Sequence, residues 1–273
     1  MTAAQVAATV MDVRRKGDYV ALRLAAPRIA AGARPGQFAA LAVGGSDSPM
    51  LLRRCFSLAG WDAGGIEVVL AVTGRGTAWL ARRRPGDVLD VVGPLGQPFR
   101  LPERPQTCVL VGGGYGAAPL VPLAAALRAA GCPVRMALGA AGASRLMAVA
   151  AAEQIADTVT VTTDDGSAGR RGRVSDVLPD MLTGVGTVYA CGPMAMLAAV
   201  ARLAAWAGMP SQVAVEESMA CGVGVCMTCV LPVIGDDGRT RMTRSCLDGP
   251  VFPGDRVRFE AVGTVPADAV GAP

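Results

Sequence analysis

The chain has 273 residues, which is more than one hydrophobic core usually holds, so two or three domains are expected. Its 26 basic and 22 acidic residues leave a net charge of +4, without the basic tail that nucleic-acid-binding proteins carry. Histidine is absent, which removes the commonest general base and the commonest zinc-enzyme ligand. Any chemistry must therefore belong mainly to bound cofactors.

The eight cysteines are too few and too unevenly placed for a secreted disulfide scaffold, and no charged start followed by an apolar core opens the chain. A reducing, cytoplasmic location is therefore expected. Residues 105–127 carry no charge over a length that would cross a bilayer, but glycines and prolines interrupt the middle. A buried strand followed by a helix is the favoured interpretation, and a membrane span remains the minor alternative.

Residues 1–103 alternate β-branched runs with glycine and proline turns, as in VAATVMDV, YVALRL, IEVVLAV and DVLDVVG. This rhythm predicts an antiparallel β-barrel, with one short helix near residues 77–83. From residue 104 to 210 the pattern changes to strands followed by alanine-rich helices, which predicts an α/β domain with a parallel sheet. Residues 211–263 form a third, cysteine-rich domain of short strands, and residues 264–273 are expected to be a flexible tail.

Several segments of the first domain could bind a ligand. Arg54 and Ser57 in LLRRCFSLAG could line a site, or could be a surface arginine and a turn hydroxyl. Gly74, Gly76 and Thr77 lead into the short helix, where free amides favour a phosphate, although Thr77 could equally be a plain N-cap.

Two strand-to-helix turns of the second domain are candidates for binding a nucleotide. GGGYGAAPL at residues 112–120 follows a strand, and CGPMAML at residues 191–197 follows another. The carboxyl ends of parallel strands line the ligand crevice of such sheets, so both turns are expected there. A structural tight turn and a small buried cysteine are the alternatives. The polar loop at residues 162–172 lies at a further strand end, where Asp164 and Asp165 could be turn formers.

The cysteines of the third domain have the most specific spacing in the chain. Cys221, Cys226 and Cys229 follow C-x4-C-x2-C, and Cys246 stands alone further on, which is the ligand pattern of a plant-type [2Fe-2S] cluster. Structural zinc sites usually group their ligands as two separated pairs, so zinc is disfavoured but open. Inert buried cysteine is the least favoured alternative.

Taken in order, these motifs resemble the ferredoxin reductase-like flavoproteins that carry their own [2Fe-2S] domain. They are most similar to electron-transfer subunits of NAD-dependent dihydroorotate dehydrogenase, over residues 5 to 262. RCFS at residues 54–57 resembles the family's R-P-[FI]-S flavin motif, with Cys55 in place of proline. E-x-x-x-C-G-x-G-x-C-x-x-C from Glu217, followed by C-x-D-G-P-V-F from Cys246, resembles its cluster motif.

The resemblance implies the redox cofactors and the residues that bind them. FAD would be bound by residues of the first domain: Arg54, Cys55, Phe56, Ser57, Leu70, Ala71, Val72, Gly76 and Thr77. NAD would be bound by residues of the second domain: Gly112, Gly114, Gly116, Cys191, Gly192 and Pro193. The cluster would be bound by Cys221, Cys226, Cys229 and Cys246 of the third domain. The family implies NAD, while Ser144 and Arg145 could suit the 2′-phosphate of NADP.

The resemblance also implies an oxidoreductase subunit that lacks a substrate base of its own. Its partner would be an FMN-containing catalytic subunit that oxidises dihydroorotate in pyrimidine biosynthesis, in a heterotetramer of two plus two. An alternative is a reductase subunit of a related NAD(P)H-dependent ferredoxin, sulfide or glutamate-synthase-type complex. Another is an interaction module stapled by zinc, with purely structural glycine turns.

Overall fold

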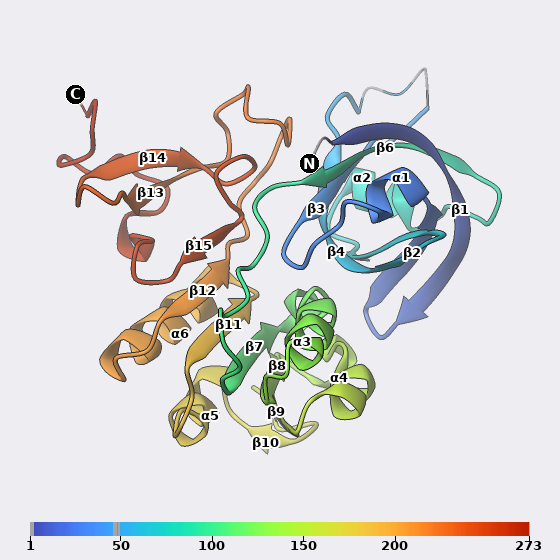
Figure 1. The fold of residues 1–273 in the computed structure, drawn as a ribbon. Coiled ribbons are helices and arrows are strands. Elements are labelled where there is room, and N and C mark those ends of the chain that lie inside the picture. Colours follow the sequence, from blue (N-terminus) through green and yellow to red (C-terminus); the bar gives the residue numbers. More distant parts are fainter. Residues whose placement is uncertain (1–2, 46–47, 49, 273) are drawn as a thin grey trace.

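The computed structural model describes residues 3–45, 48 and 50–272. Its chain forms a barrel, a layered α/β part and a smaller C-terminal part (Figure 1). The three parts surround a common centre, and residues 96–107 run between them from the barrel to the sheet.

The N-terminal part is a closed antiparallel barrel of six strands in the order β1-β2-β5-β4-β3-β6. Inward side chains such as Leu22, Leu24 and Ile66 are completely buried and form a core of their own. The strands are β1 (Ala4–Lys16), β2 (Tyr19–Ala25), β3 (Phe38–Leu41), β4 (Arg54–Asp62), β5 (Gly65–Ala71) and β6 (Val88–Leu95), with short helices α1 (Pro27–Ala30) and α2 (Arg75–Leu80).

The central part is a seven-stranded sheet in the order β10-β9-β8-β7-β11-β12-β15. All neighbours are parallel except β15, which pairs antiparallel with β12 at one edge. Its strands are β7 (Cys108–Gly113), β8 (Val134–Ala140), β9 (Thr158–Thr163), β10 (Arg170–Arg171), β11 (Thr187–Cys191), β12 (Ser211–Ala214) and β15 (Val251–Pro253).

Helices cover both faces of this sheet. Alternate residues of β7 point to opposite faces, so Leu110 packs with α3 (Leu120–Ala129), whereas Val109 and Val111 pack with α5 (Val174–Met181) and α6 (Met194–Trp206). Helix α4 (Val149–Ile155) lies beside α3 (Figure 1). The barrel residues Tyr19 and Val69 join the α3 core, and the C-terminal residues join the α6 core. The α/β part therefore joins the other two.

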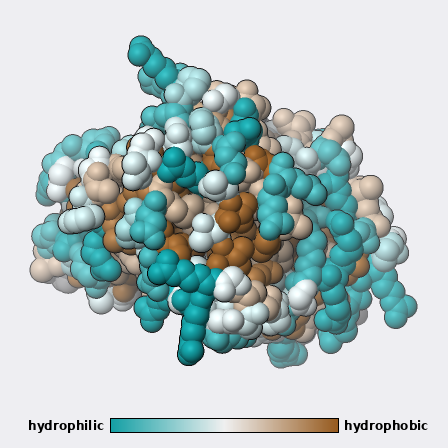
Figure 2. All heavy atoms as spheres, turned by 90° about the horizontal axis from the view of Figure 1, so that it is seen from below, coloured by the Kyte–Doolittle hydropathy of each residue, from teal (hydrophilic) through white to brown (hydrophobic). Residues whose placement is uncertain are grey.

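The C-terminal part contains the two-stranded sheet of β13 (Val230–Ile234) and β14 (Thr240–Arg244). Residues 264–272, where the sequence predicts a flexible tail, lie against β14: the amide of Val270 donates to the carbonyl of Thr240 at 2.8 Å, and Ala269 is buried. Arg258 also pairs with Asp268. Seen from below Figure 1, hydrophobic atoms gather near the middle of the surface and hydrophilic ones lie around them (Figure 2).

The predicted fold class is confirmed: barrel, α/β sheet and cysteine-rich part follow one another along the chain. Residues 105–127, the candidate membrane span, form strand β7, a 3-10 turn at Gly114–Ala117 and most of helix α3. None of the helices in the described ranges is both long and apolar enough to cross a bilayer. The sequence patterns do not predict helix α5 or the edge strand β15.

Candidate functional site

One cavity of about 580 Å³ opens where the three parts of the chain meet. Its wall is built from the barrel strands β3, β4 and β5, from the turns after β7 and β11, and from the segment after β12. This volume lies in the range of small-molecule and cofactor sites. A ligand bound there would contact all three parts at once.

The barrel side of the cavity contains most of the residues predicted to bind flavin. Of these predicted residues, β4 contributes four consecutive ones and β5 contributes two: Arg54, Cys55, Phe56, Ser57, Leu70 and Ala71. Val72 is half exposed and lies outside the cavity wall. The Arg54 guanidinium donates to the carbonyl oxygens of Leu52 at 2.7 Å and Arg53 at 3.2 Å, which holds its positive charge at the wall.

Thr77 lines the cavity, and its hydroxyl also holds the turn before helix α2. Its Oγ1 accepts the amide hydrogens of Thr73 and Gly74 at 3.0 and 3.1 Å, and donates to the carbonyl of Gly74 at 3.0 Å. Helix α2 is only 6 residues long. The Thr77 hydroxyl therefore stabilises the turn before the helix and does not by itself indicate a helix N-terminus that binds a ligand. Gly76 lies behind the wall, where an added Cβ would come within 2.8 Å of the Arg54 Nε.

The sheet side of the cavity contains three of the residues predicted to bind the nucleotide. Gly116, Cys191 and Gly192 line it. A Cβ at Gly116 would come within 2.7 Å of the Cys191 carbonyl oxygen, so glycine lets the turns after β7 and β11 pack together. Burial raises the pKa of the Cys191 thiol to about 12, which keeps it neutral. Three predicted residues lie outside the wall: Gly112, Gly114 and Pro193.

Two cavity residues that the sequence patterns do not single out, Tyr115 and Glu216, meet in the wall. The Tyr115 hydroxyl donates a hydrogen bond to the Glu216 carboxylate. The Tyr115 ring packs edge-on against Tyr19 of the barrel, with ring centroids 5.7 Å apart. Partial burial raises the pKa of Glu216 although its side chain faces the open cavity. Their sequence signals are only positional, since Tyr115 lies within the GGGYG turn and Glu216 directly precedes the cluster motif.

Ser144 and Arg145, the residues that could suit a 2′-phosphate, contact the barrel. The Asp18 carboxylate accepts a hydrogen bond from the Ser144 hydroxyl at 3.0 Å and from the Arg145 Nε at 3.4 Å. The Asp18 amide donates to the Ser144 carbonyl at 3.0 Å, and the Tyr19 hydroxyl donates to the Arg145 carbonyl at 3.1 Å. A carboxylate already neutralises the arginine, which disfavours a second anion at this point.

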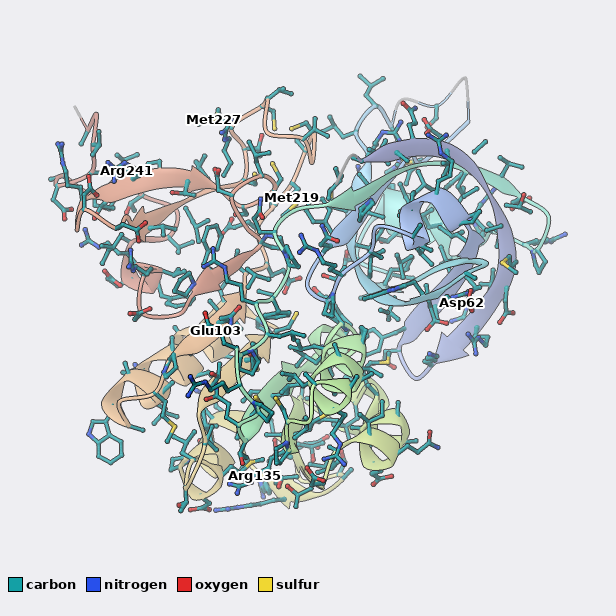
Figure 3. The ribbon with its side chains drawn as sticks, in the orientation of Figure 1. Asp62, Glu103, Arg135, Met219, Met227 and Arg241 are labelled. Carbon is teal, nitrogen blue, oxygen red and sulfur yellow. The ribbon has the colours of Figure 1, made fainter. Side chains whose placement is uncertain are left out.

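The loop that carries the first three cluster cysteines lies directly on the barrel. Gly222 and Gly224 have φ values of +72° and +83°, which favour glycine. The Gly224 carbonyl accepts a hydrogen bond from Arg244 Nη1 at 3.0 Å, which ties the loop to strand β14. Figure 3 shows Met219 between this loop and the barrel, and Met227 farther out on the loop.

The four predicted cluster ligands lie near one another, since the thiols of Cys221 and Cys226 affect each other's pKa, and those of Cys229 and Cys221 affect the pKa of Cys246. Cys229 and Cys246 are buried, whereas Cys226 is exposed. Hydrogen bonds from Thr228 and from Cys221 lower the pKa of Cys226 to about 6. A thiol with such a pKa is readily available as the thiolate that metals bind.

The four thiols match the number of protein ligands that a [2Fe-2S] cluster takes. In a [2Fe-2S] core each iron takes two protein ligands. In the part of the chain that the structure describes, no three side chains of the His, Cys, Asp or Glu type are grouped closely enough to hold one ion.

Comparison with known proteins also indicates an iron-sulfur domain in this part of the chain. The family model for the iron-sulfur cluster binding domain of dihydroorotate dehydrogenase B matches residues 216–258. The chain is 41% identical over 225 residues to the dihydroorotate dehydrogenase B (NAD(+)) electron transfer subunit of Bacillus caldolyticus, covering 80% of this chain and 84% of the relative. It is 38% identical over 241 residues to the probable counterpart from Methanopyrus kandleri, covering 88% and 86%.

A solved structure of an NADH-dependent reduced ferredoxin-NADP oxidoreductase superimposes with a TM-score of 0.82 at 30% identity. The match covers 94% of this chain and 91% of that one.

The fold and the cavity therefore define an oxidoreductase subunit of the ferredoxin reductase class with an additional iron-sulfur domain. Within that class, the chain belongs to the family of electron transfer subunits of NAD(+)-dependent dihydroorotate dehydrogenase B. Its cofactors are FAD and a [2Fe-2S] cluster, and its nucleotide is NAD. Membership also implies a catalytic partner subunit.

Proposed function

We propose that the chain carries electrons from a catalytic subunit that contains FMN and oxidises dihydroorotate, by way of the cluster and FAD, to NAD. The assembly would contain two catalytic and two electron-transfer subunits. The observation that supports this route best is the single cavity whose wall joins the flavin strand, the nucleotide turns and the segment leading to the cluster cysteines.

FAD is the necessary mediator because a nicotinamide exchanges two electrons as hydride, whereas a [2Fe-2S] cluster exchanges one at a time. The barrel wall formed by residues 54–57 and 70–71 would hold it. Arg54 supplies a positive charge for the flavin or its phosphates, and the mostly apolar remainder of the wall excludes water from the ring. Thr77 would stand beside the pyrophosphate while it maintains the turn.

The opposite wall would receive the nicotinamide. Gly116 and Gly192 allow close approach of a ligand to the backbone at the carboxyl ends of β7 and β11. Neutral Cys191 is the last residue of β11 and would place no charge next to the ring. The Tyr115–Glu216 hydrogen bond lies on the same side of the cavity. The ion pair of Arg145 with Asp18 supports NAD over NADP, because the arginine that could bind a 2′-phosphate already has a carboxylate partner.

The outer face of the cluster loop is the surface that we propose for the catalytic subunit. Three of its apolar side chains are exposed, Val223, Val225 and Met227, and Val225 is 78% exposed. Leu51 and Leu247 are further exposed apolar residues, the former on the barrel segment that precedes β4. Apolar side chains exposed around a redox centre are typical of a surface that a partner covers.

The purified chain should be reddish-brown, with the absorbance bands of flavin and of a [2Fe-2S] cluster, and should contain two irons. It should oxidise NADH with an artificial acceptor but leave dihydroorotate unchanged. Addition of an FMN-containing dihydroorotate dehydrogenase subunit should then couple dihydroorotate oxidation to NAD reduction. Turnover of dihydroorotate by the chain alone, or no binding to such a subunit, would contradict the proposal.

A second candidate function follows from the likeness to the ferredoxin-NADP oxidoreductase, whose structure superimposes over 94% of this chain. In this case the partner would be a ferredoxin-linked iron-sulfur protein. Reduction of ferredoxin by NADH in the presence of the chain, without any response to the dihydroorotate subunit, would favour this function.

A further inference from the structure

Cys55 occupies a position between the flavin wall and the cluster loop. It is the second residue of β4, pairs in register with Ala40 of β3, and lines the cavity. Proline is the residue expected there from the family motif, and proline offers neither a thiol nor an amide hydrogen. The substitution therefore adds a donor at this point of the wall.

The Cys55 side chain faces the backbone between the first two cluster ligands. A Cβ placed on Gly222 would come within 3.0 Å of the Cys55 Sγ and within 3.6 Å of the Ala40 Cβ and the Phe38 ring. Gly222 directly follows Cys221. The Cys55 sulfur thus touches the loop that would wrap the cluster.

Three of the predicted ligand cysteines lie near Cys55. Cys246, Cys221 and Cys229 are all near enough to act electrostatically on its thiol. Cys229 and Cys246 also form one apolar cluster with Phe38, against which Cys55, Leu95 and Met219 pack. On the side of Cys229 and Cys246, which are both buried, the surroundings of Cys55 are therefore apolar.

An S–H group in this position has a definite electrostatic effect. A cysteine thiol holds its proton at neutral pH, so Cys55 is a neutral donor among groups that are thiolates once the cluster is bound. Each electron that enters the cluster adds negative charge at sulfur, and a donor directed at sulfur stabilises this charge. We propose that the Cys55 thiol donates a hydrogen bond to a sulfur atom of the cluster or of its ligands Cys221, Cys229 and Cys246. This hydrogen bond would raise the reduction potential of the cluster.

The proposal rests on the proposed electron relay and is tested on the purified chain with its cofactors by a potentiometric titration followed by electron paramagnetic resonance. Cys55→Ala and Cys55→Val both remove the donor, and Val keeps apolar volume in the wall. Each should move the cluster midpoint to a more negative value. One hydrogen bond changes the equilibrium constant up to about tenfold, or about 59 mV for one electron. Cys55→Ser keeps a donor and should restore most of the potential.

Two controls make the outcome decisive. Cys132→Ala removes a buried thiol of the α/β part that lies outside the cavity, and should leave the cluster potential unchanged. The flavin midpoint of the Cys55 variants shows whether the effect is confined to the cluster. An unchanged cluster potential in both Cys55→Ala and Cys55→Val, or a Ser variant that behaves like Ala, would overturn the proposal. A wild-type chain without any cluster signal would instead overturn the proposed function.

Discussion

Gly222 shows how a single residue joins the two redox regions of this molecule. Its φ of +72° favours glycine, and its missing side chain lets the cluster loop rest on the Cys55 sulfur. Gly238 in the turn between β13 and β14 has a similar φ of +76°, but an added Cβ would meet nothing within 4 Å. The two positions therefore share a backbone requirement and differ only in the contact.

Gly222→Ala is expected to lower the iron content and the visible absorbance of the purified chain. Left-handed backbone costs a non-glycine residue about 1–2 kcal/mol, and the clash with Cys55 adds to this cost. Gly238→Ala should lose only the backbone contribution and keep its iron. Equal iron content in the two variants would show that the contact with Cys55 does not hold the loop.

Glu216 should give the free energy of unfolding a pH dependence of unusual sign. Partial burial raises its pKa above the value in the unfolded chain, so the folded state binds the proton more tightly. The resulting stabilisation is present in acid and is lost as the pH rises through the raised pKa. Urea unfolding between pH 4 and about 8 should show a smaller decline for Glu216→Gln than for wild type. Parallel curves would mean that Glu216 titrates alike in both states.

At the scale of elements, the turn of the β1–β2 hairpin contacts the loop after β8. Its Asp18 contacts both Ser144 and Arg145, and a Cβ at Gly17 would come within 2.1 Å of the Ser144 carbonyl oxygen. This contact brings a carboxylate from the barrel to the nucleotide side of the sheet. In many dinucleotide-binding folds the acidic residue follows the second strand of the sheet itself.

Asp18→Ala should therefore raise the use of NADPH relative to NADH. Exposed ion pairs contribute up to about 1 kcal/mol, so the ratio of kcat/KM values should change by roughly fivefold at most. Asp12→Ala serves as the control, because Asp12 is an acid of strand β1 in the same hairpin and pairs with Arg14 instead. No change in the ratio would show that Arg145 lies away from the bound nucleotide.

The sequence allows the local parts of this architecture to be predicted, and only those. Ligand spacing predicts the four cluster cysteines, and the strand rhythm separates barrel from sheet, because both depend on patterns that are visible along the chain. The contacts of Tyr115 with Glu216 and of Asp18 with Arg145 join residues 101 and 127 positions apart. Such pairs depend on how the three parts pack, which no periodicity encodes. Strand β15 escapes prediction because three residues are too few to show alternation.

At the scale of the whole molecule, the exposed apolar side chains of the cluster loop allow partner binding to be tested independently of electron transfer within the chain. Val225→Asp should weaken binding of the catalytic subunit by about tenfold or more, since a charge would have to be buried at the contact. The flavin and cluster spectra and NADH oxidation with an artificial acceptor should be unchanged. Trp206→Ala alters an 83% exposed apolar residue at the end of α6 and should not affect the complex. Similar binding constants for both variants would exclude the loop as the contact surface.

Strand β15 has a mechanical consequence for the relay. The chain passes through the cluster cysteines and then returns to become the last strand of the nucleotide sheet, bonded to β12. Moving the C-terminal part away from the sheet would break the backbone hydrogen bonds between β12 and β15. The C-terminal part and the nucleotide sheet are therefore expected to move together.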